Sequence, residues 1–241
     1  MTLIEKLFSL GYSNKESLGL IMSGNVLVNE EIVIKGSTKI KENDVIRIKN
    51  KKKWVSRGSY KLLEAIEKFN LDLTNKICLD VGASTGGFTQ VLLSKGAKKI
   101  YSLDSGTNQL DFTLRQNEKV VSLEKTNLKS INDDMFEEKI DFICCDVSFI
   151  SVKKLFDVLS KTNVLANNNY VLILIKPQFE ASSNIVEKGG FVNKIHHKDI
   201  IDSIISYAIK LNFIFLSIIE SPIKGNVSKN IEYLALFRKE F

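Results

Sequence analysis

The chain has 241 residues, of which 44% are hydrophobic and 26% are charged, and both values are ordinary for a soluble globular protein. This length accommodates one large domain and a small one, and the most apolar stretch, residues 170–175, is far shorter than the roughly 20 residues of a membrane-spanning helix. The net charge is +6. Residues 1–55 hold 10 Lys and Arg against 6 Asp and Glu, and the remaining residues hold 24 against 22. This excess of positive charge in the first part of the chain favours a polyanionic partner.

Cysteine usage and the first residues bear on the compartment. Cys78, Cys144 and Cys145 lie in apolar stretches that predict strands, and three thiols cannot all pair within one chain. The first residues include an acid and lack the basic segment and long apolar core of a secretion signal. We therefore expect a reducing, cytoplasmic compartment and no stable membrane association.

Residues 1–50 have the pattern of two helices followed by three short strands. Apolar residues recur at helical spacing in the first ten positions, and Gly11 ends this helix. Ser13 and Glu16 form a capping box that begins the second helix. The strands are expected at residues 26–28, 32–34 and 45–48.

The helix pair, the stretch at residues 23–29 and the later strand resemble the small RNA-binding domain named after ribosomal protein S4. The resemblance implies that residues 1–50 form an S4-like RNA-binding domain; the alternative is a folding or docking module. Residues 51–55 are a charged linker, in which we expect the lone Trp54 to pack across the domain junction rather than stack on a base. The candidate RNA contacts, chosen for charge and position, are Lys15, Lys35, Lys39 and Lys41.

A glycine-rich turn joins a buried strand to a helix between residues 77 and 89. Asp80 ends the strand, and Gly82 and Gly86 allow the backbone to turn sharply and approach a ligand, although such turns are often only structural. The G-x-G-x-x-G spacing of pyrophosphate sites is absent. Asp104, which ends the next strand, can accept hydrogen bonds from both hydroxyls of a ribose or can cap a loop. Two carboxylates near a ribose without pyrophosphate favour S-adenosylmethionine as the cofactor.

The rest of the chain alternates apolar strands with helices, which predicts a mostly parallel sheet with a terminal hairpin. Asp146 and Lys176 each directly follow an apolar strand. Lys61 lies on a helix that we expect to begin at Ser56, and Glu232 lies in the last strand. The strands are expected at residues 77–79, 100–103, 120–123, 140–145, 171–175, 213–219 and 231–237, with a further helix at residues 197–211.

Two further pairs of residues have weaker signals. Thr126 and Asn127 follow the third of these strands and are placed near the adenine of the cofactor by topology alone. His196 and His197 are the only histidines and make no metal-binding constellation, so no metal site is expected.

Five stretches of this second part, taken together, resemble the TlyA (hemolysin A) family of ribosomal RNA 2′-O-methyltransferases. The resemblance implies a Rossmann-like α/β fold of the class I S-adenosylmethionine-dependent methyltransferases, with a mostly parallel seven-stranded sheet, in an FtsJ-like domain at residues 56–241. It also implies a substrate, a cytidine in 23S rRNA with 16S rRNA as a further candidate. One departure is Lys229, where the family usually has glycine. The stretches are residues 55–58, 80–89, 146–150, 175–180 and 230–233.

The resemblance also implies the site residues. The catalytic set of the family falls on Lys61, Asp146, Lys176 and Glu232. The cofactor segment falls on Asp80, Gly82, Ala83, Ser84, Thr85, Gly86, Gly87 and Phe88, with Asp104 at the ribose. Thr126 and Asn127 are added to this set by topology alone.

The chemistry of methyl transfer requires such a set. A ribose 2′-hydroxyl is a poor nucleophile, and a lysine ammonium stabilises the negative charge that develops as its proton leaves. We expect Lys176, oriented by Asp146 and Glu232, to act on this oxygen either as a cation or, once deprotonated, as a base. Lys61 is expected to hold the substrate or to share the proton load. Any one of these residues alone could be an ordinary salt bridge. Two other hypotheses are a membrane-active hemolysin and a non-catalytic RNA-binding assembly factor.

Overall fold

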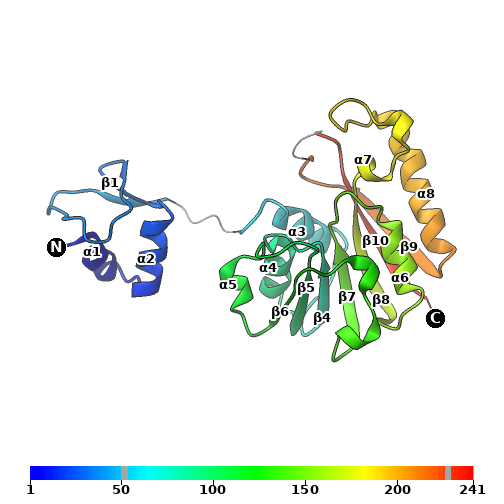
Figure 1. Cartoon of the computed structure of the whole chain (residues 1–241), viewed down its shortest axis with the longest axis horizontal. Helices are drawn as coiled ribbons and strands as arrows, with labels where there is room; N and C mark the ends of the chain where they lie inside the picture. The colour runs from blue at the N-terminus through cyan, green and yellow to red at the C-terminus, as the bar shows by residue number, and fades with distance from the viewer. Residues whose placement is uncertain (50–53, 226–228, 241) are drawn as a thin grey trace. The chain divides into compact units, whose positions relative to one another are not determined.

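The computed structural model describes residues 1–49, 54–225 and 229–240, which divide into two compact units, Met1–Lys53 and Trp54–Phe241 (Figure 1). The predicted linker at residues 51–55 straddles this division. Residues 51–53 lie outside the described part of the chain, whereas Trp54 and Val55 belong to the second unit.

The first unit pairs two helices with a small antiparallel sheet of strand order β2-β1-β3. Capping boxes begin both helices, Thr2 with Glu5 and the predicted Ser13 with Glu16. Of the predicted strand 32–34, only Ile32 belongs to a strand, and a turn begins at Lys35. The elements are α1 (Leu3–Ser9), α2 (Asn14–Met22), β1 (Val26–Val28), β2 (Glu31–Ile32) and β3 (Ile46–Ile48).

The second unit is built on a seven-stranded sheet of order β6-β5-β4-β7-β8-β10-β9. All pairs are parallel except those of β10, which is antiparallel to both β8 and β9, as the predicted terminal hairpin requires. The strands are β4 (Ile77–Val81), β5 (Lys99–Leu103), β6 (Val120–Leu123), β7 (Ile140–Cys145), β8 (Leu165–Ile175), β9 (Phe213–Glu220) and β10 (Tyr233–Lys239).

Helices cover both faces of this sheet (Figure 1). Successive residues of a strand point to opposite faces, so that Cys78 and Phe142 pack under α3 and α4, whereas Leu79 and Ile143 pack under α6 and α8. The strands are apolar on both sides for this reason. The helices are α3 (Ser59–Lys68), α4 (Gly87–Ser94), α5 (Phe112–Arg115), α6 (Lys153–Leu159), α7 (Pro177–Glu180) and α8 (His197–Ile209). Short 3₁₀ turns are η1 (Leu128–Ser130), η2 (Asp133–Met135), η3 (Ser183–Ile185) and η4 (Lys194–His196).

Trp54 packs within the second unit. Its side chain is 8% exposed and belongs to the hydrophobic core on the α3 and α4 face, together with Leu62 and Phe88. Trp54 is therefore a core residue of the second unit and is too buried to stack on a base, whereas its packing across the domain junction stays a prediction. The helix expected from Ser56 begins three residues later, at Ser59.

Burial of Trp54 yields a stability prediction. Trp54→Ala should lower the free energy of unfolding of the second unit by about 3–5 kcal/mol, because a large core side chain is replaced by a cavity. Trp54→Phe, which keeps most of the volume, should lower it by less. Urea unfolding followed by circular dichroism measures both. A reduction below about 1 kcal/mol for Trp54→Ala would contradict the core position.

Candidate active site

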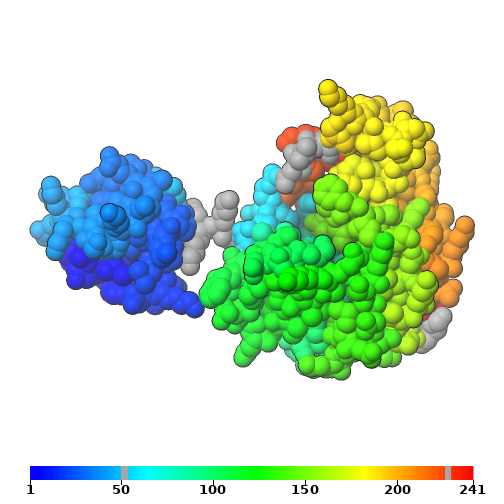
Figure 2. All heavy atoms as spheres, in the orientation of Figure 1, coloured from blue at the N-terminus to red at the C-terminus, as the bar shows by residue number. Residues whose placement is uncertain are grey.

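A cavity of about 600 Å³ lies at the carboxyl ends of β4, β7 and β8. Its wall is formed by the glycine turn after β4, the start of α3, the segments that follow β7 and β8, and residues just before β10. In the space-filling view, the cyan start of this unit, the red segment before β10 and the yellow segment after β8 meet around one part of the surface (Figure 2). Parallel strands bring these distant segments to one edge of the sheet.

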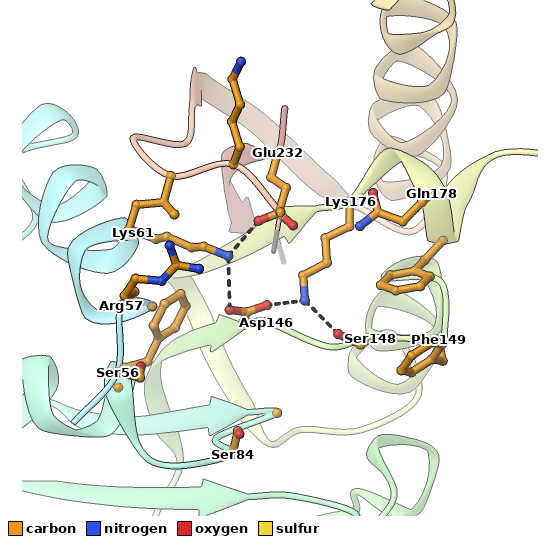
Figure 3. Close-up of a pocket in the computed structure, with 18 of the residues that line it drawn as sticks. Ser56, Arg57, Lys61, Ser84, Asp146, Ser148, Phe149, Lys176, Gln178 and Glu232 are labelled. Carbon is orange, nitrogen blue, oxygen red and sulfur yellow. Dashed lines mark hydrogen bonds and ion pairs between the residues drawn. The ribbon is translucent and has the colours of Figure 1, made fainter. Parts of the chain in front are cut away.

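The four predicted catalytic residues form one continuous chain of ion pairs in this cavity (Figure 3). Lys61 Nζ lies 2.6 Å from Glu232 Oε2 and 3.8 Å from Asp146 Oδ2. Lys176 Nζ lies 2.6 Å from Asp146 Oδ1 and donates a hydrogen bond of 2.9 Å to Ser148 Oγ. The side chains are only 3–20% exposed, so water screens these charges weakly.

The pairing differs in one respect from the predicted arrangement. Glu232 was expected to orient Lys176, but it bonds Lys61, and Ser148 takes the second position beside Lys176. Glu232 lies one residue before β10 rather than within the strand, so its side chain reaches α3. Lys229, which stands where the resembling family has glycine, adopts a positive φ of 57°, a conformation that favours glycine.

The glycines of the turn are required by packing against protein atoms. A Cβ on Gly82, whose φ is +86°, would lie 2.6 Å from the backbone oxygen of Asp146. A Cβ on Gly86 would lie 2.4 Å from a side-chain carbon of Leu114. These contacts are a reason for glycine that needs no ligand, and the predicted close approach of a ligand to the turn stays a prediction. Of the predicted cofactor residues in the turn, Gly82, Ala83, Ser84, Thr85, Gly87 and Phe88 line the cavity.

Asp80 does not line the cavity, because its side chain is wholly buried beneath the turn. Its Oδ2 accepts a hydrogen bond of 2.7 Å from the hydroxyl of Thr89 on α4. Burial raises the pKa of Asp80 to about 7, and the bond from Thr89 acts in the opposite direction. Asp80 therefore fastens the strand to the helix that follows the turn.

Asp104, at the end of β5, shapes the same turn. Its two carboxylate oxygens accept hydrogen bonds from the backbone N–H groups of Ser84, at 2.8 Å, and Gly106, at 2.7 Å. Thr126 donates to the carbonyl of Glu124, and Asn127 caps η1. Asp104, Thr126 and Asn127 lie outside the cavity lining, so their contacts with a cofactor stay predictions.

Sequence reasoning overlooked an exposed aromatic residue at the cavity. Phe149 follows β7, has a positive φ of 63° and is 91% exposed, and its ring centroid lies 5.0 Å from that of Phe179. A bulky residue in the left-handed region is strained, and such strain is frequent at functional sites. Exposed Arg57 and Lys224 also line the cavity. The available signal was an aromatic residue in the short segment between a buried strand and the next helix.

The described residues contain no membrane-spanning helix and no metal-binding cluster. None of their helices is long and apolar enough to cross a membrane. Within residues 1–49, 54–225 and 229–240, no group of three or more His, Cys, Asp and Glu side chains is arranged to hold a metal ion. His197 is buried and lies 2.9 Å from the hydroxyl of Tyr233.

Comparisons with known proteins agree on one family. The model of the FtsJ-like methyltransferase family matches residues 54–239. Hemolysin A of Brachyspira hyodysenteriae is 44% identical over 98% of this chain and 99% of its own length. The 23S rRNA (cytidine-2′-O)-methyltransferase TlyA of Campylobacter jejuni is 38% identical over 77% of this chain and 71% of its own length.

Solved structures support the same fold. The crystal structure of a Lactococcus lactis protein is 40% identical, with a TM-score of 0.75 over 79% of this chain and 90% of its own. The N-methyltransferase NodS of Bradyrhizobium japonicum, in complex with S-adenosyl-L-homocysteine, has a TM-score of 0.51 at 12% identity over 75% of this chain and 87% of its own, which is a likeness of fold alone. These structures and the sheet confirm the predicted Rossmann-like methyltransferase fold.

The pKa of Asp80 yields a pH prediction. Between pH 4 and 7, Asp80 keeps its proton in the folded state but loses it in the unfolded chain. The free energy of unfolding therefore falls as pH rises through this range, and the contribution of Asp80 becomes constant above about pH 7. From pH 5 to pH 8, the unfolding free energy of the wild type should fall by about 2 kcal/mol more than that of Asp80→Asn. Urea unfolding at both pH values measures this. Parallel changes in the two proteins would contradict the raised pKa.

Proposed function

The chain belongs to the FtsJ-like methyltransferase family, and we propose that it transfers a methyl group from S-adenosylmethionine to the ribose 2′-hydroxyl of a cytidine in ribosomal RNA. The observation that carries this proposal is the ion-pair chain of Lys61, Asp146, Lys176 and Glu232 beside the glycine turn. TlyA of C. jejuni is named a 23S rRNA (cytidine-2′-O)-methyltransferase. TlyA of Mycobacterium tuberculosis, which is 31% identical over 96% of this chain, is named a 16S/23S rRNA (cytidine-2′-O)-methyltransferase.

The cavity fits S-adenosylmethionine, which supplies an electrophilic methyl group when bound. Its volume, about 600 Å³, lies within the usual range of small-molecule sites. Ser84 and Thr85, in the turn after β4, line this cavity. Asp104 holds the turn through Ser84, and each of its oxygens keeps a further lone pair for a ribose hydroxyl.

Lys176 is proposed as the group that stabilises the developing alkoxide. Its ammonium is held by an ion pair with Asp146 and donates a hydrogen bond to Ser148, and it keeps a further N–H for the ribose oxygen. A donor fixed in a cavity with little water stabilises that charge more strongly than water does. The proton of the hydroxyl passes to the carboxylate of Asp146, because the Lys176 ammonium has no lone pair to accept it.

Lys61 and Glu232 are proposed to hold the substrate and to keep Asp146 in place. Lys61 lies between two carboxylates, so it orients Asp146 from the side opposite to Lys176. Because Glu232 neutralises Lys61, the four charges of the chain sum to zero and the cavity does not repel a nucleotide.

Side chains around the ion-pair chain suit a nucleotide. The exposed ring of Phe149 is a surface on which a base can stack. The exposed cations Arg57 and Lys224, both at the cavity, suit the neighbouring phosphates. These three residues are therefore proposed substrate contacts.

The first unit is proposed as the S4-like RNA-binding domain, and the compartment as the cytoplasm. Two capped helices and a small sheet have the predicted S4-like order of elements. Lys15, Lys35, Lys39 and Lys41 are all exposed, as contacts with phosphates require.

Replacement of Lys176 tests the catalytic role. Lys176→Ala should lower the rate of tritiated methyl transfer from S-adenosylmethionine to unmethylated ribosomal subunits by about a hundredfold or more, with cofactor affinity by calorimetry nearly unchanged. Asp146→Ala combined with Lys176→Ala should be little worse than either alone, since the two act as one unit.

Lys119→Ala, which removes an exposed lysine outside the cavity, is the matched control and should keep the wild-type rate. Ordinary turnover by Lys176→Ala would contradict the proposed role. Failure of the wild type to transfer any methyl group would leave the alternative of a non-catalytic RNA-binding factor.

Charge removal in the first unit tests the proposed RNA-binding role. When Lys15, Lys35, Lys39 and Lys41 are changed to Gln, the salt dependence of affinity for ribosomal RNA should become shallower, by about one unit of slope for each of these lysines that binds a phosphate. Changing four exposed lysines of the second unit to Gln, at the same net charge, should have a smaller effect. Filter binding at two salt concentrations measures this, and equal slopes for both variants would refute the assignment. The control lysines are Lys95, Lys119, Lys161 and Lys210.

A further inference from the structure

Gln178 brings a neutral amide to a cavity that is otherwise rich in charge. It lies on α7, two residues after Lys176, and lines the cavity. In the close-up, Gln178 and Ser84 of the cofactor turn are drawn on opposite sides of the ion-pair chain, so Gln178 lies on the side left for the substrate (Figure 3).

A buried asparagine fixes which end of this amide faces the cavity. Asn230 is 1% exposed, and its Oδ1 accepts a hydrogen bond of 2.9 Å from the backbone N–H of Val192. Its Nδ2 donates 2.8 Å to the carbonyl oxygen of Gly190 and 3.0 Å to Oε1 of Gln178.

The polarity of this network follows from the backbone. A backbone N–H can only donate and a carbonyl can only accept, so the contacts with Val192 and Gly190 allow one orientation of Asn230. Its amino group must then donate to Gln178, which must accept through its oxygen. The amino group of Gln178 is therefore turned away from Asn230.

The amino group of Gln178 is a hydrogen-bond donor available to the substrate. Among the described residues it has no hydrogen-bond acceptor, and Figure 3 draws it on the side of Gln178 toward Lys176. The lysines of the ion-pair chain are engaged by carboxylates, and Arg57 and Lys224 are charged. A neutral donor suits an uncharged acceptor, such as a ring nitrogen or carbonyl oxygen of a base.

We propose that Gln178 determines the specificity for cytosine, by donating from Nε2 to the O2 and N3 edge of the target base. Cytosine has acceptors at both positions, whereas N3 of uracil carries a hydrogen that would oppose the amide N–H. With uracil the donor keeps only the O2 acceptor and faces the N3–H, and this loss of a hydrogen bond disfavours the wrong base. This inference rests on the proposed transfer to a ribose of ribosomal RNA.

The test compares cytidine with uridine at the methylated position. The full-length protein is first used to map the nucleotide that it methylates in unmethylated ribosomal subunits, and subunits with C changed to U at that nucleotide are then prepared. The wild type should prefer C by at least about tenfold in kcat/KM. Gln178→Met, which has similar length but no donor, should prefer C by less than about threefold, with unchanged affinity for S-adenosylmethionine.

Further variants separate the donor from other effects. Gln178→Glu retains the oxygen that accepts from Asn230 but has no N–H, so it should lose the preference as Gln178→Met does. Asn230→Asp cannot donate to Gln178, so the amide is free to turn, and the preference should fall although Gln178 is intact; thermal unfolding checks its fold. Gln116→Ala, on the exposed end of α5, should keep the wild-type preference.

The outcomes separate this inference from the proposed function. If the wild type methylates no ribose of ribosomal RNA, the proposed function fails. If it methylates a cytidine but does not prefer C, or if both Gln178 variants keep the preference, the role of Gln178 is refuted while the reaction stands. Absence of the preference in both variants, with Gln116→Ala unaffected, supports it.

Discussion

The fold holds two lysines and two carboxylates together in one cavity with little water around them. Removing charges from water is costly, and this cost is offset only when each charge has a close partner. Lys61 bonds Glu232 across 171 residues of sequence and also faces Asp146, which in turn bonds Lys176. Removal of one member would leave its partner as an uncompensated buried charge. The sheet must therefore bring the four segments that carry these residues together at one edge.

The glycine turn packs against the main chain of Asp146, a member of the ion-pair chain. Gly82 packs its backbone against the carbonyl of Asp146, and a Cβ there would lie 2.6 Å from that oxygen. Asp80 and Thr89 fasten the strand below the turn to α4. A displacement of the turn would therefore move the main chain of Asp146, so the proposed cofactor site and the proposed catalytic carboxylate are mechanically coupled.

Much of the site could be predicted from the sequence, because parallel strands collect their carboxyl ends at one edge and the residues directly after them meet there. Asp146 and Lys176 were identified in this way, and the capping box of Ser13 depended only on local sequence. The partner of Glu232 could not be derived, since it depends on where a hairpin approaches α3. The packing reason for glycine at position 86 could not be predicted either, because a side chain that excludes a Cβ there belongs to Leu114, twenty-eight positions later.

The proposed reaction places the methyl group of S-adenosylmethionine on a ribose oxygen held at the ion-pair chain. Its most direct test is mass spectrometry of nucleosides from unmethylated ribosomal subunits, incubated with the protein and S-adenosylmethionine that carries a deuterated methyl group. We expect the label to appear in 2′-O-methylcytidine. Label on a base, or no label in the RNA, would contradict it.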